Sequence, residues 1–179
     1  MENDEISRHN PGNYERNYFY KGTGRQSYTV KKTFSRATSV QNTIKADPAI
    51  IWALLTNAPD YPRWNSTVIS IEGNIAKGEK IRLKSVLDVK RTFKLKVKEL
   101  EPEQRMVWGD GKGNRVYTLA KNSDNTITFT MSEKIGGLMF PMYAKYIPPF
   151  DKAFEQFAAD LKKEAELIQN TKNKRYARH

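Results

Sequence analysis

The residue types that most often carry nucleophilic or metal chemistry are scarce in this sequence of 179 residues. It has no cysteine, and its two histidines, His9 and His179, stand near the two ends of the chain. Without a thiol or an imidazole in the core, the usual nucleophile–base pairs and most transition-metal sites are excluded. We therefore expect no catalytic residue, no metal and no cofactor in this chain.

Glu133 is the carboxylate whose position most suggests a function. In residues 126–133, apolar side chains alternate with threonine and serine, and Glu133 falls on the apolar side. It is therefore a candidate buried acid with a raised pKa near the mouth of a cavity. The alternative, which we favour, is that the strand ends there and Glu133 reaches solvent or pairs with a lysine, because structural ion pairs resemble functional ones.

Three tyrosines are candidate hydrogen-bond donors to a ligand carbonyl or phenol, namely Tyr117, Tyr143 and Tyr146. Each could equally pack in the core with its hydroxyl at the rim. The sequence places no second carboxylate, glycine-rich phosphate loop or metal-ligand cluster beside them. Enzymatic activity is therefore possible but unsupported by the residues themselves.

The elements that would position these side chains are mainly strands. Apolar and polar residues alternate in residues 79–87, 89–98, 114–121 and 126–133, and more briefly around 106–108. This alternation predicts strands with one wet and one dry face. Because the connections between them are short, neighbouring strands must be antiparallel.

Helices are predicted on either side of these strands. An extended segment, residues 33–46, is followed by Asp47 and Pro48, which are typical of a helix N-cap and first turn. Near the C-terminus, residues 149–168 form one apolar stripe at three- and four-residue steps, which predicts a long amphipathic helix. This helix would close the core against the dry face of a strongly bent sheet.

Composition favours one soluble domain. The chain is long enough for one core and has no apolar stretch near the roughly 20 residues that cross a bilayer. The acidic first residues lack the apolar region of a signal peptide, so we expect a cytoplasmic protein. We predict a polar N-terminal extension (1–32), an α+β domain (33–169) and a basic C-terminal tail (170–179).

Local sequence around the first predicted helix resembles a known family. The segment 46–56 (ADPAIIWALLT) and the segment 61–65 (YPRWN) resemble the opening of the START-like (SRPBCC) superfamily, in its polyketide cyclase/dehydrase and lipid-transport branch. Gly136-Gly137-Leu138 and residues 154–162 (FEQFAADLK) resemble that branch's closing turn and terminal helix. The resemblance covers about residues 36–168.

The resemblance implies a helix-grip fold of class α+β. In this fold a curved antiparallel β-sheet wraps around a long C-terminal α-helix, with two short helices after the first strand. Members include cyclases, but many bind or carry lipids, quinones, polyketides or other apolar molecules without changing them. It therefore implies a cavity for a small hydrophobic ligand and leaves the chemistry open, with metal-free cyclase-like acid–base catalysis as an alternative.

We predict that inward-facing side chains of the sheet and of the helices form the ligand site. The predicted ligand-binding residues are Trp64, Leu83, Phe93, Leu95, Met106, Trp108, Tyr117, Phe129, Met131, Phe140, Tyr143, Phe154 and Phe157. The alternative is that these residues fill a solid core, which alternation by itself does not exclude. Residues 138–147, apolar and flanked by glycines and prolines, are a candidate lid, here called the lid segment.

The net charge of +11 raises a second hypothesis. Seven cations are predicted on the wet face of two adjoining strands: Lys80, Arg82, Lys84, Lys90, Lys94, Lys96 and Lys98. This basic sheet face could dock on an anionic membrane or an acidic partner, or could simply be a solvated face. It lacks the interleaved aromatic residues on which bases would stack, which argues against nucleic acid.

Overall fold

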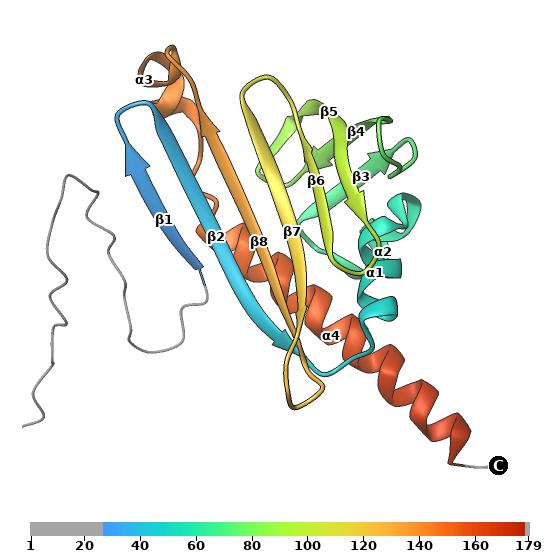
Figure 1. Cartoon of the computed structure of the whole chain (residues 1–179). Coiled ribbons are helices and arrows are strands. Elements are labelled where there is room, and N and C mark those ends of the chain that lie inside the picture. Colours follow the sequence, from blue (N-terminus) through green and yellow to red (C-terminus); the bar gives the residue numbers. More distant parts are fainter. Residues whose placement is uncertain (1–26, 178–179) are drawn as a thin grey trace, which may run out of the picture.

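Eight strands form one antiparallel sheet that curves around the long helix α4, as the computed structural model shows for residues 27–177 (Figure 1). The strand order is β1-β2-β8-β7-β6-β5-β4-β3. The elements are β1 (Ser27–Lys32), β2 (Ser35–Ile44), α1 (Pro48–Thr56), η1 (Ala58–Asp60), α2 (Tyr61–Trp64), β3 (Val68–Glu72), β4 (Lys80–Ser85), β5 (Asp88–Glu101), β6 (Arg105–Gly109), β7 (Gly113–Lys121), β8 (Ile127–Gly136), α3 (Phe140–Tyr143), η2 (Ala144–Tyr146) and α4 (Asp151–Tyr176).

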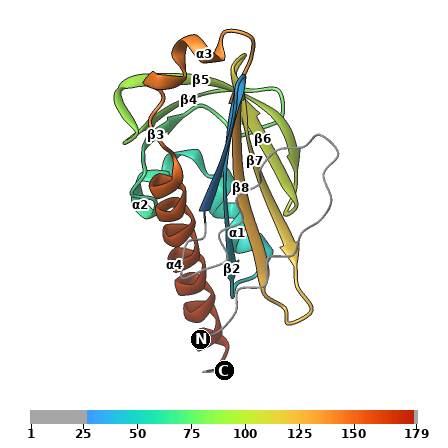
Figure 2. The same cartoon turned by 90° about the vertical axis from the view of Figure 1, so that its left-hand side faces the viewer.

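The predicted α+β helix-grip architecture is confirmed. Helix α4 lies along one face of the sheet, and the short helices between β2 and β3 cover the part of the sheet beyond it (Figure 2). The N-cap prediction also holds, because the Asp47 side chain accepts a hydrogen bond from the Ala49 amide (3.0 Å) and Pro48 opens α1.

Ordered structure extends past the domain limits predicted from the sequence. Strand β1 (Ser27–Lys32) pairs along its whole length with β2, in register from Ser27 opposite Val40 to Lys32 opposite Ser35. None of its residues is buried, and it lies at the edge of the sheet, where only one side is paired. Helix α4 likewise continues to Tyr176, inside the predicted basic tail. The rest of the predicted N-terminal extension, residues 1–26, and residues 178–179 lie outside the described residues.

The core is an aromatic cluster between α4 and the sheet. Phe157 of α4 packs against Trp64 (5.7 Å between ring centroids), Tyr117 (5.9 Å) and Phe129 (6.3 Å). All four side chains are buried. Burial of a large aromatic side chain is among the strongest single contributions to a core, so this cluster holds the helix in the sheet.

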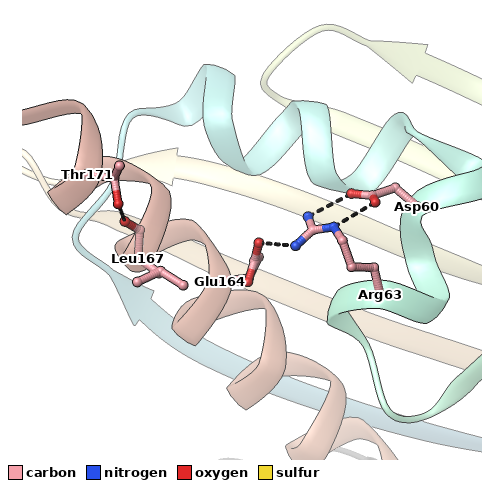
Figure 3. Close-up of polar contacts among 5 residues, drawn as sticks. All are labelled: Asp60, Arg63, Glu164, Leu167 and Thr171. Atoms are coloured by element: carbon pink, nitrogen blue, oxygen red, sulfur yellow. Dashed lines mark hydrogen bonds and ion pairs between the residues drawn. The ribbon is translucent and has the colours of Figure 1, made fainter. Parts of the chain in front are cut away.

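A polar contact outside the core fixes α4 against the short helices. The Arg63 guanidinium donates to both carboxylate oxygens of Asp60 (2.7 and 2.8 Å) and to Glu164 of α4, as Figure 3 shows. Two parallel bonds between guanidinium and carboxylate are a strong and directional arrangement. Arg63 therefore ties the predicted YPRWN segment to the long helix.

The Arg63 contact predicts a pH-dependent stability. The hydrogen bonds and charge of Arg63 hold the pKa of Asp60 below its ordinary value of 3.8. A depressed folded-state pKa contributes stability above the unfolded-state pKa, and this stability is lost as the pH falls through the folded value. Arg63→Gln should therefore be less stable than the wild type at neutral pH, and the difference should shrink below about pH 4.

Urea denaturation of both proteins between neutral and acidic pH measures this difference. Lys163→Gln removes an exposed cation of α4 next to Glu164. It is the matched control and should show little change at any pH. A stability difference for Arg63→Gln that stays constant on acidification would contradict the assigned role of Asp60.

Candidate ligand pocket

A pocket of about 160 Å³ opens between the sheet and the segment that leads into α4. Its walls come from the β4–β5 hairpin, β6, the β6–β7 turn, the ends of β7 and β8, and residues 143–150. Most of its lining is apolar or aromatic. These segments meet because the β4–β5 and β6–β7 turns lie at the same end of the sheet as α3 (Figure 1).

Five of the predicted ligand-binding residues line this pocket: Leu83, Phe93, Leu95, Trp108 and Tyr143. The others pack elsewhere. Trp64, Met106, Tyr117, Phe129, Met131, Phe154 and Phe157 belong to the buried core. Phe140 is buried against the ring of Tyr143, with 5.6 Å between centroids. The structure therefore divides the predicted set into a pocket group and a core group, and a role in ligand binding stays a prediction for both.

The core group leaves almost no space beneath the pocket. A second void, lined by Met131, Phe154 and Phe157, measures only about 10 Å³. A single water needs about that much room. The aromatic rings of α4 thus fill the concave face around this void, and the pocket of about 160 Å³ lies at the end near the lid segment.

An ion pair forms part of the polar lining of the pocket. Arg115 of β7 lies directly opposite Glu133 of β8 in the sheet register, and its Nε donates to Glu133 Oε2 at 2.6 Å. The two side chains are only 15% and 16% exposed. Burial alone would lower the pKa of Arg115, but the charge of Glu133 raises it above its ordinary value.

The favoured interpretation of Glu133 does not match this contact, because β8 continues past it to Gly136 and its partner is Arg115 and not solvent or a lysine. Sequence reasoning missed Arg115. A signal was present, since Arg115 has the same parity along its strand as Tyr117 and Leu119. It therefore belongs to the dry face of that strand. A buried arginine requires a partner, and Glu133 was the inward-facing carboxylate nearest in sequence. The strand register was still needed to pair them.

Two buried hydrogen-bonding groups lie in and next to the lining. The Trp108 indole nitrogen has no hydrogen-bond partner among residues 27–177, whereas the Tyr117 hydroxyl lies close to the Arg115 guanidinium. Trp108 lines the pocket, and its ring packs edge-on against Tyr117 at 5.0 Å. Burial raises the pKa of Tyr117, and the nearby charge of Arg115 opposes that shift. Tyr117 is therefore a neutral donor.

The lid segment is anchored at both ends and exposed between them. At its start, Gly137 has φ of +130°, a conformation that favours glycine, and its amide donates to the Phe34 carbonyl at 3.0 Å. At its end, Arg36 donates to the carbonyls of Ile147 (3.1 Å) and Pro148 (2.7 Å). Tyr143, Tyr146 and Ile147 contribute to the pocket wall.

The seven cations of the basic sheet face are all exposed. Lys80 lies opposite Lys96 and Arg82 opposite Lys94 in the register of β4 and β5. Arg82 is paired with Glu72 of β3, and Lys98 donates to the Asn114 side chain. None of the seven belongs to the lining of the pocket.

The described residues give no other candidate centre. Within residues 27–177, no group of three histidine, cysteine or carboxylate side chains comes together as a metal site would require. In the same range, none of the helices combines the length and apolar content needed to cross a membrane.

Comparison with known proteins agrees with this geometry. Residues 35–166 match the family described as polyketide cyclase / dehydrase and lipid transport. The chain belongs to this family. Membership supports the binding of a hydrophobic ligand in general terms and leaves the ligand and any reaction open. A search of curated proteins found no match.

Solved structures of similar fold include a START superfamily protein from Mycobacterium smegmatis, with 14% identity over 74% of this chain and 98% of that one and a TM-score of 0.55. A conserved protein of unknown function from Enterococcus faecalis has 14% identity over 77% and 75% of the two chains, with a TM-score of 0.56. The di-domain ARO/CYC StfQ from the steffimycin biosynthetic pathway has 13% identity and a TM-score of 0.55 over 74% of this chain. This chain spans 45% of that longer protein. Identities this low establish the shared fold alone.

The ion pair beside the pocket yields a prediction on stability. Arg115→Met or Glu133→Leu alone should lower the free energy of unfolding by about 2–4 kcal/mol, because each leaves one charge in a mostly buried position without its partner. The double variant should lose less than the sum of the two, since it leaves no unpaired charge. Denaturant unfolding of the four proteins measures the coupling. Strictly additive losses would show that the pair contributes no interaction of its own.

Proposed function

We propose that this protein binds a small hydrophobic molecule in the pocket between the sheet and the lid segment. The observation that carries the proposal is an apolar, aromatic-lined cavity with the Arg115–Glu133 ion pair in its lining. A concave apolar site with a few oriented polar groups is the usual form of a small-molecule site. Membership in a family described for polyketide cyclases and lipid transport supports the same class of ligand.

The volume of the cavity limits what fits inside it. At about 160 Å³ it resembles a dry engineered cavity of roughly 150 Å³ that accepts benzene. A molecule or molecular fragment of about one aromatic ring therefore fits with the lid segment as it stands. A longer lipid-, quinone- or polyketide-like ligand would extend through the mouth or displace the lid segment.

The lining also specifies the polar end of the ligand. Arg115 lies in the pocket lining, and its guanidinium has five N–H donors, of which Glu133 engages only some. We infer that the ligand carries a carbonyl, phenol or carboxylate oxygen that faces these donors.

The lid segment is the proposed route of access. Both its ends are tied to the β1–β2 region through Gly137 and Arg36, whereas Leu138, Met139 and Met142 between them are exposed. Motion between two fixed ends would open the pocket without disturbing α4. Methionine side chains adapt to different shapes, which supports a range of ligands.

A specific observation favours a second candidate function, docking through the basic sheet face. Lys80 lies opposite Lys96 on β4 and β5, an arrangement of like charges that is unfavourable unless an anion compensates it; in the second such pair, Arg82 opposite Lys94, Glu72 already compensates Arg82. An anionic membrane or an acidic protein would supply that anion. The vesicle experiment described below separates this candidate from binding at the pocket end.

Filling the pocket tests the proposed function. Leu95 of β5 lines the pocket, and Leu95→Trp should occupy the space and lower the affinity for a one-ring phenol, p-cresol, by roughly tenfold or more. Leu100→Trp is the matched control, because Leu100 is partly buried on the same strand but does not line the pocket. Isothermal titration measures affinity, and thermal unfolding verifies that both variants fold.

Native mass spectrometry of freshly purified protein, followed by denaturing extraction, should reveal a co-purified apolar molecule. A ligand found this way replaces p-cresol in the titration. Equal affinity of the wild type and Leu95→Trp for the same compound would place its binding outside this pocket and contradict the proposal.

A further inference from the structure

Exposed apolar side chains gather around the mouth of the pocket. Eleven large hydrophobic residues are exposed among residues 27–177, and seven of them belong to the turns and the lid segment at this end. These seven, which we call the pocket rim, are Phe34, Val86, Val89, Leu138, Met139, Met142 and Tyr146. Scattered exposed hydrophobics are normal, whereas a group of them marks an interaction surface.

The most prominent of them come from the lid segment. Leu138 is 87% exposed, Tyr146 74% and Met142 68%. The backbone around them is held in place, since Phe140, two residues after Leu138, is buried and packs on Tyr143. In this position of the lid segment, the apolar side chains are therefore presented to solvent.

Cations stand between the apolar side chains of the pocket rim. Lys90, Arg91, Lys112 and Lys145 lie in the same turns and in the lid segment, and all four are exposed. Lys112 Nζ lies 5.3 Å from the centre of the Tyr143 ring, and Lys145 Nζ lies 4.9 Å from that of Tyr146. None of the four forms an ion pair with a carboxylate of the described residues.

Carboxylates at this end are fewer and in part already engaged. Asp110 accepts hydrogen bonds from the backbone amides of Lys112 (2.7 Å) and Gly113 (3.0 Å), and Glu133 is paired with Arg115. Asp88 is the third carboxylate in the pocket lining. The outer surface of the pocket rim is therefore apolar and positive.

We propose that the pocket rim docks on an anionic lipid bilayer, with Leu138, Met142 and Tyr146 inserted among the lipids and the cations at the headgroups. Apolar and aromatic side chains flanked by lysine and arginine match the chemistry of an anionic membrane interface. A second copy of this chain would bring two positive rims together, which charge repulsion disfavours. Docked in this way, the pocket mouth faces the membrane, where an apolar ligand dissolves.

Flotation with lipid vesicles tests the proposal without any ligand. The full chain should bind vesicles of phosphatidylcholine mixed with phosphatidylglycerol, and should bind pure phosphatidylcholine vesicles much more weakly. The double variant Leu138→Asp/Met142→Asp should weaken binding by roughly tenfold or more, since it removes two inserted apolar side chains. Both positions are exposed, so folding should be unaffected, as thermal unfolding will verify.

A matched control separates position from charge. Leu167→Asp/Tyr176→Asp adds the same two negative charges at positions 57% and 72% exposed on the far half of α4, and should reduce binding much less. On addition of vesicles, the fluorescence of Tyr146→Trp should shift to the blue by more than that of the wild type. The fluorescence of Tyr176→Trp should show no such extra shift.

Three results would overturn the proposal. The first is an absence of vesicle binding by the wild type. The second is equal loss of binding in the rim variant and the α4 control. The third is loss of binding by Lys94→Glu/Lys96→Glu together with unchanged binding by the rim variant, which would assign docking to the basic sheet face. Because no ligand is present, each of these outcomes leaves the proposed ligand binding standing.

Discussion

The packing of Phe157 against Trp64, Tyr117 and Phe129 is the interaction on which the rest of the structure depends. It joins the terminal helix, the short helices and the middle of the sheet at one point. A bent sheet with a single covering helix has no other large apolar surface to bury, so the position of these rings sets the distance between α4 and the strands. The Arg63 contacts to Asp60 and Glu164 then hold the same arrangement from outside.

The aromatic cluster also determines where a ligand can bind. Because the rings fill the concave face around the small void, the pocket of about 160 Å³ lies at the end where the hairpins and the lid segment meet. Arg115 lies at the boundary between these two regions. It lines both cavities and lies over the Phe154 ring, 5.1 Å from its centre, while its charge is paired with Glu133. The polar part of the pocket is thus supported directly by the core.

Both proposals concern this one end of the molecule. An apolar ligand is poorly soluble in water, so a pocket that receives it benefits from a mouth that meets a lipid surface. The end formed by the lid segment and the neighbouring turns carries the cavity, most of the exposed apolar side chains and cations without carboxylate partners. The opposite end carries the β7–β8 turn and the C-terminal half of α4 (Figure 1).

The sequence by itself determined the fold and the identity of the dry faces. Alternation in the strands, the Asp47-Pro48 start of α1 and the apolar stripe of α4 each depend on local geometry, which sequence spacing reports directly. The tertiary structure alone decided which inward residues fill space and which leave it open. That outcome depends on the separation of α4 from the sheet, so Trp108 lines the pocket whereas Phe129, on the same dry face, is packed solid. The Arg115–Glu133 pair and the pairing of β1 were equally inaccessible, because strand register and edge pairing are contacts between distant parts of the chain.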